Sequence, residues 1–176
     1  MKTKGLVHVY TGTGKGKTTS AVGLGIRALG SGMEVYYASF HKEPEKYGYA
    51  EMEVLKKLGI RIMNYAKGHP HMNEYADEAG IKAEVNKGME ELSMILKERH
   101  VDLLIMDEIL ISVRDGYLEE SELRDFIKRK PSHTELVLTG RGATSGIMEL
   151  ADYVSDIRKI KHPYDRGIRS RKGIEY

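Results

Sequence analysis

The chain has 176 residues, 40% of them hydrophobic and 31% charged, and its 28 Lys and Arg nearly balance its 26 Asp and Glu. This length suits one domain and this composition suits a folded globular protein, while a net charge of +2 gives no overall case for a nucleic-acid partner. The absence of cysteine excludes disulfide scaffolds, thiolate metal sites and cysteine nucleophiles. No run approaches the roughly 20 apolar residues of a membrane span, and the first residues show no secretory signal pattern. We therefore expect a cytoplasmic protein with no membrane and no nucleic-acid partner.

Short apolar runs alternate with amphipathic stretches along the chain. In chain order, the patterns predict strand 5–10, helix 17–29, strand 33–40, helix 51–58, strand 60–64, helix 81–100, strand 101–106, helix 119–129, strand 134–139, helix 145–151 and strand 153–160. The segment 65–78 has no clear period and is predicted to be a long loop, a kind of segment that is often functional. The alternation predicts an α/β fold, a predominantly parallel sheet flanked by helices, in a single domain over residues 1–176. Such a sheet binds its ligands at the carboxyl ends of its strands.

The sharpest motif is T-G-T-G-K-G-K-T-T at residues 11–19, between the first strand and the first helix. Its glycines let the backbone curl so that several N–H groups point at one anion, and the helix N-terminus adds a positive end. Lys17 would place an ammonium on phosphates and Thr18 would offer a hydroxyl to Mg²⁺. The match to G-x-x-x-x-G-K-[ST] is imperfect, because Thr11 stands where the first glycine belongs. A glycine-rich turn that only starts a helix is the plain alternative.

The strand–loop–helix context favours a phosphate-binding loop, or P-loop, and with it a P-loop NTPase-like (RecA-like) fold. The predicted nucleotide-binding residues in this loop are Gly12, Thr13, Gly14, Lys15, Gly16, Lys17, Thr18 and Thr19.

Two further strand ends carry charged groups. The apolar run 101–106 ends in Asp107 and Glu108, which we predict to bind Mg²⁺ (or Mn²⁺) or its waters together with Thr18. An exposed acidic pair that caps the next segment is the alternative. The strand 134–139 is followed by Arg141, whose guanidinium suits a phosphate; a surface arginine in a turn is an equally open interpretation.

Taken together, these residues resemble the P-loop corrinoid adenosyltransferases, which act on cob(I)alamin or cob(I)yrinic acid a,c-diamide. The resemblance covers nearly the whole chain and rests on residues 5–12, 15–19, 24–30, 107–109, 138–141, 151–152, 161–163 and 171–176. The combination of Thr-Gly-Arg at 139–141 with the closing Lys-Gly-Ile-Glu-Tyr is more specific than the P-loop alone.

The resemblance implies transfer of the 5′-deoxyadenosyl group of ATP to cobalt(I), with release of triphosphate. Carried over by position, residues 12–19 would hold the triphosphate, Thr18 and Glu108 the Mg²⁺, and Arg27 and Arg141 would contact the nucleotide. The catalytic residues would be Lys17, Glu108 and Arg141. The nucleophile would be the cobalt of the substrate, so the protein's part would be to align cobalt with C5′ and to stabilise charge on the departing triphosphate. The family also implies a homodimer.

The sequence departs from the family at the corrinoid site, at its N-terminus and at His41-Lys42-Glu43, where the family commonly shows Lys followed by Gly. Members often carry Gly-Phe-x-Trp where the corrinoid binds, and Gly68-His69-Pro70-His71 stands here. We expect His69 or His71 to pack under the corrin or to contact its side chains. An exposed polar loop and a His-x-His metal site are the alternatives.

Other groups leave alternatives open. The tail 157–172 holds seven Lys or Arg against one Asp, which indicates a solvated face or a surface for the corrinoid or an acidic flavoprotein reductant. Tyr47, Tyr49 and Tyr65 would either stack on adenine or corrin or pack in the core. The competing functions are a P-loop phosphotransferase or ATPase, in which Glu108 would activate the group that attacks the γ-phosphate, and a non-enzymatic nucleotide switch.

Overall fold

Six parallel strands form one sheet in the order β3-β2-β4-β5-β1-β6. The computed structural model describes residues 4–43, 48–66 and 77–175. The strands are β1 (Val7–Thr11), β2 (Val35–Phe40), β3 (Arg61–Tyr65), β4 (Leu103–Asp107), β5 (Glu135–Thr139) and β6 (Tyr153–Asp156). The helices are α1 (Lys17–Gly30), α3 (Ala50–Lys57), α4 (Glu78–Glu98), α5 (Ile109–Arg114), α6 (Glu120–Arg129), α7 (Ser145–Met148) and the 3₁₀ helix η1 (Pro163–Arg166). The predicted parallel sheet is confirmed.

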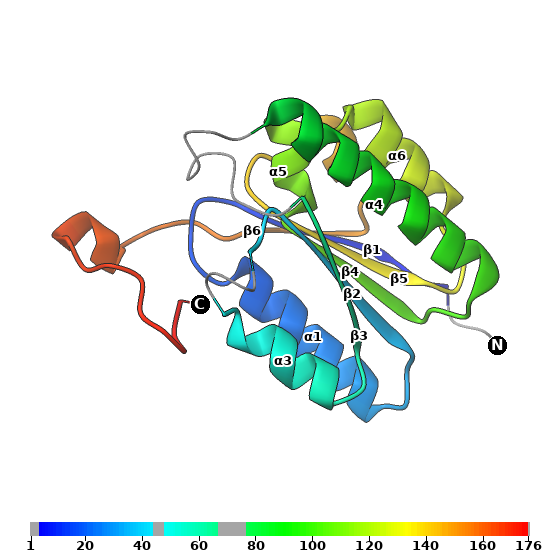
Figure 1. Ribbon diagram of the computed structural model, residues 1–176, viewed down its shortest axis with the longest axis horizontal. Helices are drawn as coiled ribbons and strands as arrows, with labels where there is room; N and C mark the ends of the chain where they lie inside the picture. The colour runs from blue at the N-terminus through cyan, green and yellow to red at the C-terminus, as the bar shows by residue number, and fades with distance from the viewer. Residues whose placement is uncertain (1–3, 44–47, 67–76, 176) are drawn as a thin grey trace.

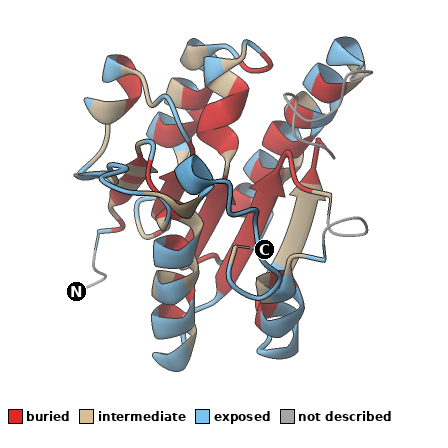
Figure 2. Ribbon diagram, turned by 90° about the vertical axis from the view of Figure 1, so that its left-hand side faces the viewer, coloured by how far each residue is buried: buried red, intermediate tan, exposed pale blue. Residues whose placement is uncertain are grey.

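Helices cover both faces of this sheet. Figure 1 shows α1 and α3 on one face and α4, α5 and α6 on the other. The strands β2 and β4 are buried along their whole length, as expected of central strands in a sheet covered on both faces. Figure 2 shows these buried strands between helices whose outer faces are exposed. Among the described helices, none has the length and apolar character needed to cross a membrane.

The structure differs from the sequence prediction at two helices. The segment 109–114 (Ile-Leu-Ile-Ser-Val-Arg) forms α5, which the sequence prediction missed because three of its six residues are β-branched and its apolar character continues that of β4. The strand ends at Asp107 because Glu108 adopts a left-handed backbone with φ of 65°. The predicted last strand is also shorter than expected, and η1 follows it.

The structure describes only the two ends of the loop predicted over residues 65–78. Residues 67–76 lie outside the described residues, and α4 begins at Glu78. Tyr65, for which stacking on a ligand and packing in the core were both open, is 7% exposed and packs against Phe40 with ring centroids 5.5 Å apart. The core interpretation is therefore the one the structure supports for Tyr65.

Two helical glycines are expected to respond in opposite directions to alanine. A Cβ at Gly88 in α4 would stand 2.7 Å from the Tyr65 ring, whereas one at Gly23 in α1 would meet nothing within 4 Å. Gly88→Ala should lower the free energy of unfolding by about 1–3 kcal/mol through overpacking. Gly23→Ala should raise it by about 0.5–1 kcal/mol because alanine is the better helix former. Urea denaturation measures both, and equal effects at the two positions would contradict this packing of α4 on β3.

Candidate active site

The glycine-rich loop between β1 and α1 lies against the chain that follows β6. The amide of Gly14 donates to the carbonyl of Ile157 at 2.7 Å. A Cβ on Gly14 would stand 2.8 Å from that carbonyl, and a Cβ on Gly12 would stand 2.5 Å from it. These two glycines therefore allow a close approach of backbone to backbone, in addition to the curl that the motif predicts.

Lys17 opens α1 and folds back over this loop. Its ammonium donates to the carbonyl of Gly12 at 3.0 Å and to that of Gly14 at 2.7 Å, and the residue is only 7% exposed. Burial lowers the pKa of Lys17, and the nearby Arg141 lowers it further, whereas Glu108 and Asp107 oppose the shift. The cation is thus held at the place where the motif predicts a phosphate.

Asp107 is the centre of a buried hydrogen-bond network at the end of β4. Its Oδ1 accepts from the hydroxyls of Thr18 at 3.0 Å and Thr139 at 2.6 Å. Its Oδ2 accepts from the hydroxyl of Tyr37 at 2.7 Å and from the ammonium of Lys42 at 2.6 Å. Four donors surround this carboxylate, which has no exposed surface, and one of them is the Thr18 hydroxyl that it orients.

Lys42 neutralises that carboxylate from the neighbouring strand. It is 7% exposed, its Nζ lies 3.5 Å from Glu51 Oε1, and it stands 4.9 Å from the centre of the Tyr49 ring. Burial would lower the pKa of Lys42, but Asp107 outweighs it and raises this pKa to about 12. Burial likewise would raise the pKa of Asp107, and the charge of Lys42 and the surrounding hydrogen bonds bring it below its usual value.

Sequence reasoning did not place Lys42 in the site. The contact arises because β2 pairs with β4 in a register that sets Ser39 opposite Asp107, which puts the ends of the two strands side by side. A signal was available, since Lys42 lies two residues after the predicted strand 33–40 and such strand ends meet at one edge of a parallel sheet.

Glu108 has the opposite character from its neighbour Asp107. Its backbone amide donates to the hydroxyl of Thr139 at 3.0 Å, which holds the left-handed turn. Its Oε2 is buried and has no hydrogen-bond partner among the described residues. Burial and the charge of Asp107 raise the pKa of Glu108 to about 7, against Lys42, Lys17 and Arg141, which lower it.

The residues around this carboxylate fit a magnesium ion. The Thr18 hydroxyl and the unpartnered Glu108 oxygen are hard oxygen donors, and Mg²⁺ commonly takes one or two protein ligands with phosphates and waters completing its shell. Within the part of the chain that the structure describes, no group of three or more Asp, Glu or His could hold a metal on its own. The donor set is therefore one that a bound triphosphate would complete.

The structure brings one of the two predicted arginines to the site. Arg141 follows β5 and is exposed, and its charge acts on both Lys17 and Glu108. Arg27 lies in the last turn of α1, ten residues after Lys17 and so about 15 Å along the helix axis. Any contact of Arg27 with the nucleotide would therefore lie far from the phosphate-binding loop 12–19. His69 and His71, the predicted corrinoid contacts, lie outside the described residues.

A pocket of about 410 Å³ opens beside the loop. Five separate parts of the chain form it: the start of α1, the end of β2, the start of α3, the end of β4 and the segment 173–175. Its lining residues are Thr18, Thr19, Val22, His41, Lys42, Tyr49, Ala50, Glu51, Glu108, Gly173, Ile174 and Glu175.

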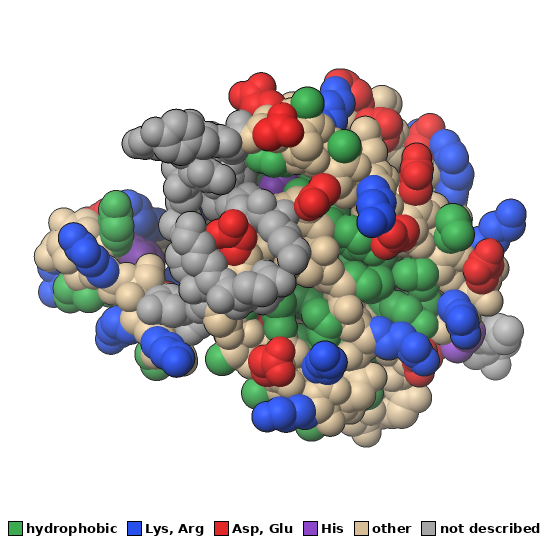
Figure 3. Space-filling model, viewed as in Figure 1, with side chains coloured by type: hydrophobic (Ala, Val, Ile, Leu, Met, Phe, Trp, Pro, Cys, Tyr) green, Lys and Arg blue, Asp and Glu red, His purple; other side chains and the backbone are tan. Residues whose placement is uncertain are grey.

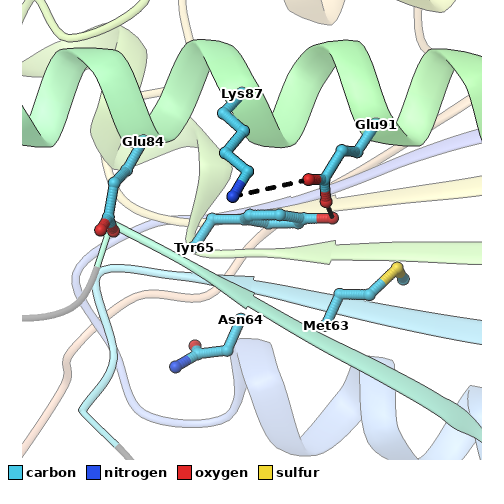
Figure 4. A pocket seen from close by; sticks show the side chains of 6 residues that line it. All are labelled: Met63, Asn64, Tyr65, Glu84, Lys87 and Glu91. Carbon is cyan, nitrogen blue, oxygen red and sulfur yellow. Dashed lines mark hydrogen bonds and ion pairs between the residues drawn. The ribbon is translucent and has the colours of Figure 1, made fainter.

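A second pocket of about 390 Å³ lies between β3 and α4 (Figure 4). Glu91 joins its two walls, because it accepts from the Tyr65 hydroxyl at 2.8 Å and lies 3.8 Å from the ammonium of Lys87. Asn64, on the β3 wall, donates to the carbonyl of Lys42 at 3.3 Å. This pocket is therefore linked to the site through the end of β2.

The buried Glu108 is expected to make the nucleotide-free protein less stable as pH rises. Its pKa of about 7 in the folded chain exceeds its usual 4.5, so the folded state binds the proton more tightly and loses stability between these values. Glu108→Gln should therefore raise the free energy of unfolding by roughly 3 kcal/mol at pH 8 and change it little near pH 5. Thermal unfolding in EDTA across this range is the measurement. A gain of the same size at every pH would contradict this origin.

A parallel sheet with a glycine-rich loop between β1 and α1, a buried lysine in that loop and an acidic pair at the end of β4 defines a P-loop nucleotide-binding protein. The solved structure of a KaiC-like protein from Pyrococcus horikoshii OT3 shares the fold, with a TM-score of 0.53 and 17% identity over 86% of this chain and 70% of that one. The predicted P-loop NTPase-like fold is confirmed.

Sequence similarity identifies the family of the chain more narrowly than the fold does. Residues 3–176 match the family described as ATP:corrinoid adenosyltransferase BtuR/CobO/CobP. Corrinoid adenosyltransferase CobA of Salmonella typhimurium is 34% identical over 175 residues, which are 98% of this chain and 86% of that protein. The corrinoid adenosyltransferases of a Sinorhizobium species and of Escherichia coli are 34% and 33% identical, each over 98% of this chain and over 81% and 86% of their own. The chain belongs to the ATP:corrinoid adenosyltransferase family, as the sequence resemblance predicted.

Proposed function

We propose that this adenosyltransferase binds ATP with its triphosphate in the loop 12–19 and transfers the 5′-deoxyadenosyl group to cobalt(I) of cobalamin or a cobyrinic acid derivative. The observation that carries the proposal is the arrangement around Asp107. Its hydrogen bond orients the Thr18 hydroxyl, and the neighbouring Glu108 keeps an unpartnered oxygen at the same strand end. This is where a P-loop enzyme needs donors for a metal-bound triphosphate.

The reaction needs no nucleophile from the protein. The electron pair of cobalt(I) forms the bond to C5′, the bond from C5′ to the α-phosphate oxygen breaks, and the electron pair of that bond leaves with triphosphate. The cobalt is thereby oxidised to cobalt(III). Lys17 would exchange its two loop carbonyls for phosphate oxygens, and Arg141 would add a second cation to the leaving group. Mg²⁺ held by Thr18 and Glu108 would neutralise further charge on it.

The remaining expectations belong to the same proposal. A projecting arm after β6 carries seven exposed Lys or Arg (Arg158, Lys159, Lys161, Arg166, Arg169, Arg171 and Lys172). Figure 3 shows Lys and Arg side chains on this arm. We propose it as the surface for an acidic flavoprotein reductant. The same arm exposes Ile160 at 95% and Tyr164 at 71%, which supports a homodimer. We place the enzyme in the cytoplasm as one domain.

Identification of the phosphorus product tests the function. The protein is incubated with MgATP, with and without reduced corrinoid, and the products are read by ³¹P NMR and by the absorbance of the corrinoid. Triphosphate that forms only with corrinoid supports adenosyl transfer. ADP with orthophosphate would instead indicate the phosphotransferase or ATPase alternative, and absence of turnover would indicate a nucleotide switch.

A further inference from the structure

The last residues of the chain reach back to the pocket beside the phosphate loop. After β6 the chain projects away from the sheet through η1 and then returns beside the ends of α1 and α3 (Figure 1). Gly173, Ile174 and Glu175 line the same pocket as Thr18 and Glu108. The function proposed above gives these closing residues no role, although they are among the most specific parts of the sequence.

These residues form a tight turn, which we call the C-terminal turn (Arg171–Glu175). The carbonyl of Arg171 accepts from the amides of Ile174 at 3.2 Å and Glu175 at 2.9 Å. The Arg171 guanidinium binds the Glu175 carboxylate at 3.0 and 3.2 Å, and the Arg171 amide donates to it at 2.8 Å. Gly173 supplies the left-handed residue, with φ of 78°. The turn thus fixes its own shape, and Ile174 is exposed directly after its left-handed residue.

The ion pair makes the C-terminal turn compatible with a neighbouring triphosphate. Hydrogen bonds from Arg171 lower the pKa of Glu175 to about 2, and Lys15 of the loop contributes in the same direction. The carboxylate is therefore charged but neutralised within the turn. An unpaired carboxylate at this place would repel the substrate, whereas the ion pair cancels the charge of Glu175 and Lys172 leaves the turn with a net positive charge.

The pocket has the size and chemistry of a nucleoside site. Its volume of about 410 Å³ lies at the lower end of the roughly 300–1,000 Å³ typical of small-molecule pockets, a size that suits adenosine. Thr18 and Glu108 border its phosphate end, and Val22, Tyr49 and Ile174 supply apolar surface elsewhere. Ile174 is 57% exposed, so a ligand would bury apolar surface that water now covers.

We propose that the C-terminal turn is a wall of the nucleoside subsite, with Ile174 packing against the adenosine of ATP while the triphosphate occupies the loop. This inference rests on the proposed function, because it assumes the triphosphate position. It gives each of these residues a role: Arg171 and Glu175 close the turn, Gly173 allows it, and Ile174 contacts the ligand.

The test compares a ligand that has the nucleoside with one that lacks it. Mg-ATP and magnesium tripolyphosphate are titrated by calorimetry into the full-length protein and into Ile174→Ala. The variant should bind ATP about fivefold more weakly, since part of one apolar contact is removed, and should bind tripolyphosphate unchanged. Ile168→Ala is the matched control, because Ile168 is 44% exposed on the same arm and does not line the pocket. It should bind both ligands like the unmodified protein.

Arg171→Ala provides a second variant, which opens the turn without removing Ile174. It should weaken ATP binding in the same direction and by at least as much, whereas a thermal melt confirms that each variant folds. Unchanged ATP affinity in both variants, or an equal loss for ATP and tripolyphosphate in Ile174→Ala, would overturn the proposal. These two results would leave the proposed function unaffected. The proposed function would be contradicted by a different result, namely that the unmodified protein binds neither Mg-ATP nor magnesium tripolyphosphate.

Discussion

Lys17→Ala is expected to abolish adenosyl transfer while the protein remains folded. Among the described residues the hydrogen-bond partners of its ammonium are the carbonyls of Gly12 and Gly14, and the side chain is buried in the loop proposed to bind the triphosphate. Its loss should lower kcat by about 10²–10³-fold, because it stabilises charge that develops on the leaving group. The two lost hydrogen bonds should lower stability by only about 1–3 kcal/mol. Steady-state kinetics with reduced corrinoid and a urea denaturation curve give the two numbers.

Lys15→Ala is the control within the same loop. Lys15 is exposed, so its charge is screened by solvent and its removal should change kcat by less than about tenfold. If Lys17→Ala turned over like the unmodified protein, the assignment of residues 12–19 as the phosphate-binding loop would be wrong.

Lys42→Met is expected to be the most destabilising single change at the site. It leaves the fully buried Asp107 carboxylate without the cation that stands 2.6 Å away. Removing one partner of a buried ion pair typically costs about 3–5 kcal/mol, because the other charge stays buried and uncompensated. Urea denaturation at neutral pH measures this loss. Because Asp107 also orients Thr18, magnesium-dependent ATP binding should weaken in the folded fraction.

A double-mutant cycle separates this coupling from a general loss of packing. Asp107→Asn removes the charge that Lys42 neutralises, so the double variant Lys42→Met, Asp107→Asn should be clearly more stable than the sum of the single losses predicts. Losses that simply add would show that the two side chains do not depend on each other, against the short contact between them.

The features that could be predicted from the sequence are those whose residues lie close together along the chain. The loop 11–19, the helix that follows it and the apolar run before Asp107 each carry their signal within about ten residues, so the P-loop and the acidic strand end were found. The resemblance added the family because its closing residues and the Thr-Gly-Arg at 139–141 are specific. The family match confirms that prediction.

What escaped prediction depends on contacts between distant parts of the chain. Lys42 reaches Asp107 only because β2 pairs with β4, across 65 positions of sequence, and no local pattern encodes that register. The helix α5 was missed because its β-branched residues favour a strand, and burial against the sheet overrides that preference. The close approach of Gly14 to the carbonyl of Ile157 could not be predicted either, because these two residues are far apart in the sequence.

The strand order has a consequence for the order of folding. The strand β1, which carries the phosphate loop, pairs with β5 and β6 and with no other described strand, so its partners lie more than 120 positions later. Pairing of β1 with these strands first requires a very long loop to close, which costs conformational entropy before any contact forms. This slows folding and delays the incorporation of β1 into the sheet. During synthesis the loop leaves the ribosome first and is positioned among the last. A chain that emerges from the N-terminus thus becomes able to bind nucleotide only when nearly all of it has been made.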